Sequence, residues 1–179
     1  MVSLEADNPF WQFSLQVYGT PGVAEECLEV QDRLGIDVNV VLYVAWLGAK
    51  RGVVLQRAEI DCIDEAIKAW SADVVQPLRA VRRRLKLMPE AGDHEVQALR
   101  KRVAKTELFS EQLEQALLYR LADDIGRSTA GSVATAAQNV SAVLGTRGAD
   151  AGAFPLHKLL AAAGAARTDR PRRTGIEPA

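Results

Sequence analysis

Apolar side chains recur at every third or fourth position along most of this chain, which is the spacing of one face of an α-helix. Glycine, proline and capping residues divide the pattern into segments. The predicted helices span residues 10–18, 21–34, 38–50, 56–69, 70–87, 93–125, 131–144 and 155–163. No convincing β-strand pattern is present. The sequence therefore predicts an all-α fold, a single-domain helical bundle of about seven or eight helices with one long helix.

The helix boundaries follow from a few residues with special backbone or capping roles. Thr20 is predicted to cap a helix whose first residue is Pro21, where a missing N–H has no consequence. Asp37 is predicted to cap the next helix. Pro77 lies inside the segment 70–87 and should kink it or begin a new helix, because proline lacks the N–H that a helix interior uses.

Two segments should organise the core. The segment 38–50 is apolar almost all round, so we expect it at the centre of the bundle. The segment 93–125 is long enough to be the backbone of the bundle, or it bends. Its apolar stripe consists of Val96, Leu99, Val103, Phe109, Leu113, Leu117 and Leu121.

The C-terminal end of the chain differs from the rest. Gly126 is predicted to end the long helix. From Ala165 onward the sequence has no apolar periodicity and is rich in arginine. We therefore predict one helical domain over residues 1–164 and a disordered basic tail over residues 165–179.

Composition excludes several classes of protein. The chain has 179 residues, 48% hydrophobic and 25% charged, as in an ordinary globular domain and unlike a collagen-like or wholly disordered chain. Its two cysteines exclude a disulfide-rich scaffold, and its two histidines lie far apart and predict no metal site. No cofactor motif is present, so we expect no cofactor. No signal peptide or membrane-spanning segment is visible, which by elimination favours a cytoplasmic protein without membrane contact.

Charge is distributed unevenly along the chain. Residues 1–65 hold eleven acidic and four basic residues, whereas residues 79–105 hold nine basic and three acidic residues. The basic residues flank one predicted turn, so they should share one end of a helical hairpin. The predicted basic patch consists of Arg82, Arg84, Lys86, Arg100, Lys101, Arg102 and Lys105.

Three interpretations of this basic hairpin are open. Residues near the end of segment 70–87 suit the negative end of that helix dipole. They can also pair with the acidic first part of the chain, within the molecule or across a dimer. Alternatively they form a patch for an anion or a nucleic acid. The net charge of −1 and the lack of aromatic residues between positions 79 and 105 count against nucleic acid.

A second signal is a group of polar residues at the entry to the most apolar helix, namely Asp32, Asp37 and Asn39. Helix capping explains Asp37 and Asn39. If the carboxylates are instead buried they need partners, and Arg79 or Arg83 would provide them. These five residues are the candidate binding site.

Several short motifs match a known family. They are Pro21-Gly22-Val23, Cys27-Leu28, Gln31-Asp32, Gly35, Asp37-Val38-Asn39 and Trp46-Leu47-Gly48, followed by Trp70 and Val74-Val75-Gln76-Pro77-Leu78-Arg79. On these motifs the chain resembles a proteobacterial family of hypothetical proteins that is classed as a domain of unknown function. The resemblance covers residues 10–86 and, more loosely, the long helix. It implies a small all-α cytoplasmic protein and no particular activity.

The sequence leaves three functions open. The first is a binding or assembly module whose basic hairpin binds a protein partner or a second copy of the chain. The second is an enzyme or small-ligand-binding protein with a polar pocket at Asp32, Asp37, Asn39, Arg79 and Arg83. The third is a nucleic-acid-binding regulator that uses the basic hairpin and the tail.

Overall fold

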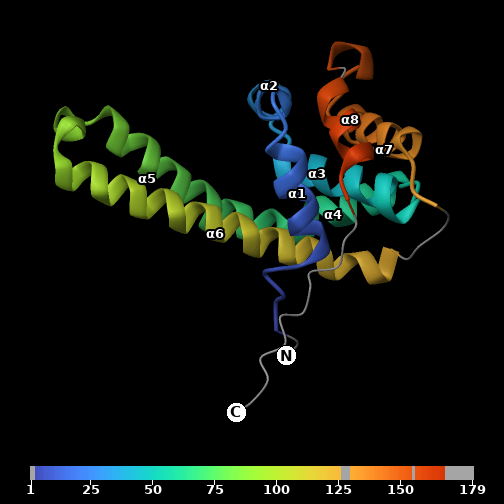
Figure 1. The fold of residues 1–179 in the computed structure, drawn as a ribbon, viewed down its shortest axis with the longest axis horizontal. Coiled ribbons are helices and arrows are strands. Elements are labelled where there is room, and N and C mark those ends of the chain that lie inside the picture. The colour runs from blue at the N-terminus through green and yellow to red at the C-terminus, as the bar shows by residue number, and fades with distance from the viewer. Residues whose placement is uncertain (1–2, 126–129, 155, 168–179) are drawn as a thin grey trace.

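The computed structural model describes residues 3–125, 130–154 and 156–167. The regular structure in these ranges is entirely helical, which confirms the predicted all-α, single-domain fold (Figure 1). The helices are α1 (Pro9–Tyr18), α2 (Val23–Leu34), α3 (Val38–Trp46), α4 (Arg57–Trp70), α5 (Gln76–Leu87), α6 (His94–Ile125), α7 (Val133–Gly145) and α8 (His157–Ala165). A π-turn follows α3 (Leu47–Arg51) and another follows α4 (Ser71–Val75). Short 3₁₀ turns precede α6 (Pro89–Gly92) and α8 (Ala151–Ala153).

The helix α3 is the centre of the body, as its apolar sequence predicts. All of its residues after Val38 are buried, and it contacts α1, α2, α6, α7 and α8. Phe10 of α1 packs against Tyr43 and Trp46 of α3, with ring centroids 5.1 and 5.5 Å apart. The aromatic contact fixes α1 across α3.

A close contact between α7 and the π-turn Leu47–Arg51 covers another side of α3. A Cβ on Gly48 would lie 2.5 Å from the Cα of Ala136, so the two backbones approach at a distance that only glycine allows. The Gly48 carbonyl accepts a hydrogen bond from the Ser132 N–H at 3.1 Å. Asn139, one turn further along α7, is fully buried and hydrogen-bonds three backbone groups of residues 44–55.

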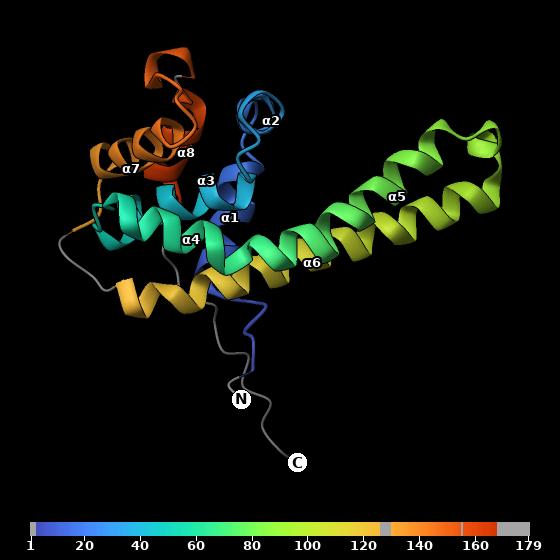
Figure 2. The ribbon, with the colours of Figure 1, turned by 180° about the vertical axis from the view of Figure 1, so that it is seen from behind.

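The helices α4 and α5 form one continuous rod (Figure 2). The sequence predicts a boundary between residues 69 and 70 and an interruption at Pro77. In the structure the helix widens into the π-turn Ser71–Val75, and Pro77 follows in the first turn of α5. Proline cannot donate a backbone hydrogen bond, and its ring crowds the carbonyl four residues earlier. A wider turn accommodates both effects, so the rod continues through the proline.

The start of α2 differs from the prediction. Thr20 does not cap α2, because its hydroxyl donates to the Gln16 carbonyl of α1 at 3.1 Å. The residue before α2 is Gly22, whose φ of 86° is a left-handed conformation that favours glycine. Pro21 and Gly22 therefore form a turn, and α2 begins at Val23.

A two-helix arm projects from the body (Figures 1 and 2). The arm is residues 76–106 and consists of α5, the turn after it and the N-terminal part of α6. No side chain of α5 is buried. The predicted apolar stripe of α6 is wrong in part, because Leu99 and Phe109 are 48% and 53% exposed. The buried face of α6 is largely polar and consists of Glu107, Ser110, Glu114, Gln115, Ala116, Leu118 and Ala122.

The remaining predictions concern the C-terminal part of the chain. Gly126 and residues 168–179 lie outside the described residues, so the predicted helix end and most of the predicted tail stay predictions. Residues 165–167 are described, and the Ala166 carbonyl accepts a hydrogen bond from Lys50 at 2.7 Å. In the described part of the chain, no helix has the length and apolar character needed to cross a membrane.

Replacing Gly48 with alanine should destabilise the fold. The new methyl group would collide with the backbone of α7, and overpacking of this kind costs about 1–3 kcal/mol. Urea denaturation followed by circular dichroism measures the loss. Gly145→Ala is the matched control, because a Cβ there meets no atom within 4 Å, and it should leave stability unchanged or raise it. Equal stability of the wild type and Gly48→Ala would contradict the contact.

Candidate ligand-binding cleft

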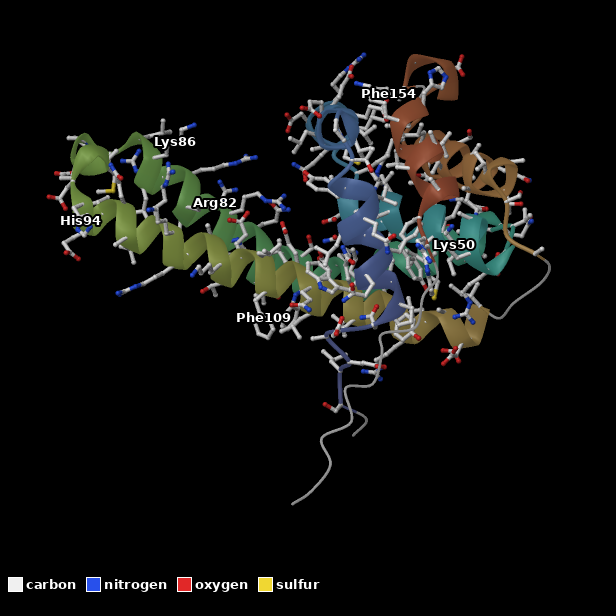
Figure 3. The ribbon with its side chains drawn as sticks, in the orientation of Figure 1. Lys50, Arg82, Lys86, His94, Phe109 and Phe154 are labelled. Carbon is white, nitrogen blue, oxygen red and sulfur yellow. The ribbon has the colours of Figure 1, made fainter. Side chains whose placement is uncertain are left out.

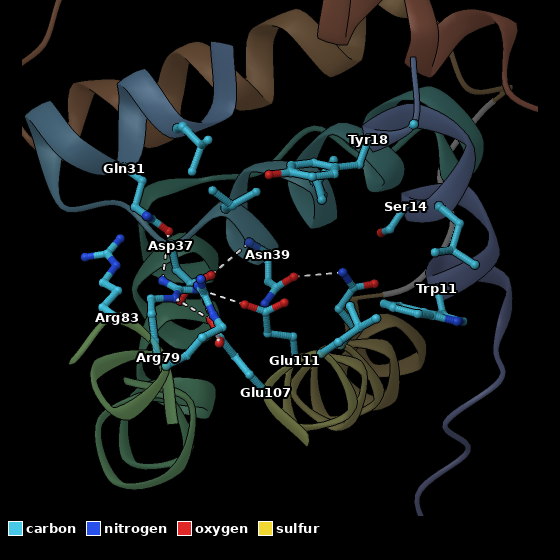
Figure 4. A pocket seen from close by; sticks show the side chains of 18 residues that line it. Trp11, Ser14, Tyr18, Gln31, Asp37, Asn39, Arg79, Arg83, Glu107 and Glu111 are labelled. Atoms are coloured by element: carbon cyan, nitrogen blue, oxygen red, sulfur yellow. Dashed lines mark hydrogen bonds and ion pairs between the residues drawn. The ribbon is translucent and has the colours of Figure 1, made fainter. Parts of the chain in front are cut away.

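A cleft of about 440 Å³ lies in the corner where the arm leaves the body. Its walls come from α1, α2, α3, α5 and α6 (Figure 4). One wall is apolar and aromatic, with Trp11, Leu15 and Tyr18 of α1. The facing wall is polar and carries Gln31, Asp37, Asn39, Arg79, Arg82, Arg83, Glu107, Glu111 and Gln115. The cleft is therefore suited to a molecule with both apolar and hydrogen-bonding parts.

Four of the five predicted site residues meet in this cleft. Asp37, Asn39, Arg79 and Arg83 line it, whereas Asp32 is exposed on α2 and does not. The hydrogen bonds of Arg79 go to α2 and α6 and not to Asp37 or Asn39. The predicted arginine is therefore present, but its partners differ from those that the sequence suggests.

Arg79 is the centre of a charge cluster. Its guanidinium donates hydrogen bonds to Gln31 Oε1 at 3.1 Å, Glu107 Oε1 at 3.2 Å and Glu111 Oε1 at 2.6 Å. Arg82 donates to both carboxylate oxygens of Glu107. Two arginines thus neutralise two carboxylates, and the cluster links α5 to α2 and α6.

Burial and pairing have opposite effects on these carboxyl groups. Burial disfavours the charged form of Glu107, but hydrogen bonds from Arg82 and Arg79 outweigh it and lower the pKa of this group. In Glu111, burial outweighs the contact with Arg79 and raises the pKa. Glu107 is therefore the firmly ionised member of the cluster.

A second polar network lies beside this cluster and is centred on Asn39. The Asn39 amide nitrogen donates to Glu114 Oε2 at 2.5 Å, and its amide oxygen accepts from Gln115 Nε2 at 2.7 Å. Asp37 caps α3 as predicted, because its carboxylate accepts from the Asn39 backbone N–H at 2.8 Å. The same carboxylate accepts from the Ser71 hydroxyl at 3.2 Å. This network joins the start of α3 to α6 and to the π-turn before α5.

Glu114 is fully buried at the inner end of this network. Burial, together with the nearby carboxylate of Asp37, raises the pKa of Glu114 to about 8 against the opposing hydrogen bond from Asn39. Its Oε1 atom has no hydrogen-bond partner among the described protein atoms. The carboxyl group is therefore mostly protonated at neutral pH, with Oε2 as the acceptor from Asn39.

Two polar atoms in the cleft wall lack partners. The Ser14 hydroxyl and Gln115 Oε1 form no hydrogen bond with the described protein atoms. Both residues line the cleft and are 3% exposed, and the Ser14 hydroxyl points from α1 toward the polar wall (Figure 4). A buried polar group without a partner costs about 1–3 kcal/mol. A bound molecule with a hydrogen-bond donor would remove this penalty if it displaced the side chains that cover these two atoms.

A second cleft, of about 460 Å³, lies on the other side of Asp37 between α2 and α4. Four of its five charged side chains pair with one another, Lys68 with Glu65 at 3.0 Å and Arg147 with Asp64 at 3.4 Å, and the fifth is Asp37. Nowhere in the described ranges do three or more His, Cys, Asp or Glu side chains gather so that they could hold a metal ion. The first cleft is therefore the candidate site.

One comparison with known proteins gives a match. The sequence profile of a family described as "Protein of unknown function (DUF2390)" matches residues 9–118. The chain belongs to the DUF2390 family. The matched segment begins in α1 and ends in α6, so it contains every residue that lines the first cleft. No curated protein and no solved structure matches the chain.

Sequence analysis missed Gln31 and the residues that α6 contributes to the polar wall of the DUF2390 cleft. Glu107, Glu111, Glu114 and Gln115 recur at helical spacing and form one face of α6. The signal was present as an acidic stripe, but hydrophobic periodicity identifies only apolar faces. Such a stripe on its own is typical of a solvated surface.

The predicted basic patch divides into paired and unpaired residues. Arg82 pairs with Glu107, so pairing within the molecule involves α6 and not the acidic first part of the chain. The others, Arg84, Lys86, Arg100, Lys101, Arg102 and Lys105, form no ion pair with another described residue, and all except Arg100 are exposed. Figure 3 shows Arg82 close to the body and Lys86 further out on the arm.

Glu114 should make the stability of this DUF2390 protein fall as the pH rises. Its pKa is about 8 in the folded protein and 4.5 for a free glutamate side chain, so the folded protein holds an extra proton between these values. The stabilisation by this proton is complete below pH 4.5 and is lost as the pH rises through about 8. Urea unfolding midpoints measured across this window should decline.

Glu114→Gln is the informative variant, because glutamine resembles the protonated carboxyl group. Its unfolding midpoint should fall less steeply than that of the wild type across the same window and exceed it at the alkaline end, because Glu111, whose pKa is also raised, remains in the variant. Glu95→Gln is the control, because this side chain is 88% exposed, and it should keep the wild-type slope. A wild-type slope in Glu114→Gln would assign the pH dependence to another group.

Proposed function

We propose that this protein is a binding protein whose cleft holds an amphipathic ligand. The observation that carries the proposal is the pair of buried, unpartnered atoms in the cleft wall, the Ser14 hydroxyl and Gln115 Oε1. Gln115 cannot rotate its amide to bring the nitrogen into the cleft, because Nε2 already donates to Asn39. A ligand that displaces the side chains covering Gln115 Oε1 would supply this atom with an N–H or O–H group.

The apolar wall favours an aliphatic or aromatic group in the same ligand. Leu15, Tyr18, Leu28 and Leu108 line the cleft and are 48%, 38%, 42% and 52% exposed. Large apolar side chains gain about 25 cal/mol for each Å² that a ligand removes from water. Four such residues around one cleft provide the apolar contact area that small-molecule and peptide sites use.

The charges in the cleft favour an uncharged group at its inner end. Arg79 and Arg82 are neutralised by Glu107 and Glu111, and a ligand ion would have to displace one of them. Arg83 also lines the cleft, but it is exposed and has no ion pair among the described residues. An anionic group of the ligand would therefore lie toward Arg83.

The geometry favours binding over catalysis. The pKa of Glu114 suits proton transfer, but Glu114 is not among the residues that line the cleft. The carboxylates of Glu107 and Glu111 do line it and are held by arginines. The Ser14 hydroxyl has no hydrogen-bonded base among the described residues, as an activated nucleophile would require.

Ser14→Ala should weaken ligand binding without loss of stability. The hydroxyl has no partner in the described protein, so its removal breaks no hydrogen bond and eliminates a buried unsatisfied group. A fragment library screened by ¹H–¹⁵N NMR would identify cleft ligands through the Trp11 indole and Gln115 side-chain signals. Fragments that carry an N–H or O–H donor on an apolar ring should bind, and Ser14→Ala should lower their affinity about tenfold.

Ser141→Ala is the control for this experiment, because Ser141 lies on α7 outside the cleft. It should leave the affinity of the fragments unchanged. The proposal is wrong if no fragment shifts the two reporter signals. It is also wrong if Ser14→Ala binds donor-bearing fragments as tightly as the wild type does.

A further inference from the structure

The cleft opens onto the arm at Arg83, which lines the cleft and is exposed. Lys86 lies seven residues after Arg79 on α5, and Lys101 lies seven residues before Leu108 on α6. Residues seven apart lie on the same side of a helix. Because Arg79 and Leu108 both line the cleft, Lys86 and Lys101 lie on the cleft side of the arm. We call Arg83, Lys86 and Lys101 the cationic strip.

The cationic strip has no internal counter-ion. Its three side chains are exposed and form no ion pair with another described residue. Leu87, four residues after Arg83 and so on a neighbouring part of the same face, is 75% exposed. The arm therefore presents positive charge and the apolar side chain of Leu87 together, on the side where the cleft opens.

The chemistry of the cleft and the cationic strip fits a protein segment better than a nucleic acid. Residues 71–108 contain no Phe, Tyr or Trp side chain, so bases have nothing to stack on beside the cationic strip, and the aromatic side chains Trp11 and Tyr18 lie in the cleft. The apolar wall of the cleft has no counterpart in a phosphate backbone, whereas an acidic peptide offers both carboxylates and apolar side chains.

We propose that the cleft and the cationic strip form one docking groove for an acidic segment of a partner protein. An apolar side chain of the segment occupies the cleft, and its carboxylates pair with Arg83, Lys86 and Lys101. A peptide backbone also supplies the N–H donor that Gln115 Oε1 lacks. This inference rests on the proposed binding function of the cleft and names the kind of partner.

Selection from a displayed library of random peptides on the full-length protein tests the inference. The selected peptides should contain several Asp or Glu residues and at least one large apolar residue. Each is then synthesised with a fluorescent label, and its affinity is measured by anisotropy. Reversal of two charges in the strip, Lys86→Glu with Lys101→Glu, should weaken binding about tenfold or more and reduce its dependence on salt.

The matched control reverses two exposed charges elsewhere on the arm, Arg84→Glu with Arg102→Glu. Each follows a strip residue by one position and therefore points to a different side of its helix. The control changes the net charge equally but should keep most of the affinity. Circular dichroism melts of both double variants establish that the arm is folded in each.

Several outcomes would overturn the inference. Selected peptides without acidic residues would do so, as would an equal loss of affinity in the two double variants. Strip-dependent binding of poly(U) RNA without peptide binding would assign the strip to a nucleic acid. Strip-dependent dimerisation in sedimentation experiments would assign it to a second copy of the chain. If fragments bind the cleft while acidic peptides do not, the cleft function stands and this inference alone fails.

Discussion

A helix that turns a polar face inward needs a partner for each polar group on that face, and α6 imposes this requirement on the rest of the structure. Glu107, Glu114 and Gln115 are all buried, and a buried charge without a partner is strongly destabilising. Arg79 and Arg82 satisfy Glu107, and the amide of Asn39 satisfies one atom each of Glu114 and Gln115. The helix α5 must therefore lie along α6 in one register. The same requirement fixes the start of α3, because Asn39 reaches α6 only from the first turn that Asp37 caps.

This requirement also determines what is left for a ligand. The arginines and carboxylates at the base of the arm neutralise one another, so the inner cleft keeps little net charge. Both polar atoms of the Asn39 amide have a partner within the network, whereas Gln115 keeps one free acceptor and Ser14 one free hydroxyl. A molecule selected only for stability would replace such atoms with apolar ones, since burying a polar group without a partner is unfavourable. Their position in a cleft with an aromatic wall is the basis of the proposed binding function.

The sequence predicted those parts of the fold in which apolar patterning and burial coincide. The apolar segment around Val41 is the central helix, and Asp37 caps it. The apolar pattern could not predict a buried face that contains Glu107 and Glu114. Periodicity of apolar residues carries no information about polar partners that lie far apart in the chain. It placed Leu99 and Phe109 in the core for the same reason. The capping rule also failed at Thr20. Its hydroxyl donates to a carbonyl of the preceding helix α1 and therefore does not cap α2.

The candidate site was partly predicted because Asn39 and Arg79 stand out beside apolar segments. The fold brings Glu111 and Gln115 to them only through the pairing of α5 with α6.

The arm shows most clearly how two kinds of cation differ on a single helix. Arg79 and Arg82 are 15% and 36% exposed and both are paired, so their removal would leave carboxylates of α6 uncompensated. Further out, Arg83, Arg84 and Lys86 are exposed and form no ion pair with another described residue, so their charges contribute nothing to a core. Cations on one face of a two-helix hairpin repel one another, which weakens the hairpin slightly in isolation. Folding alone would therefore favour a mixture of charges on this face, as on the body, where Arg33, Arg57 and Lys68 each pair with an acid on their own helix. An anionic partner on this positive face would reduce the repulsion between its cations, whereas the cleft beside it is already neutralised.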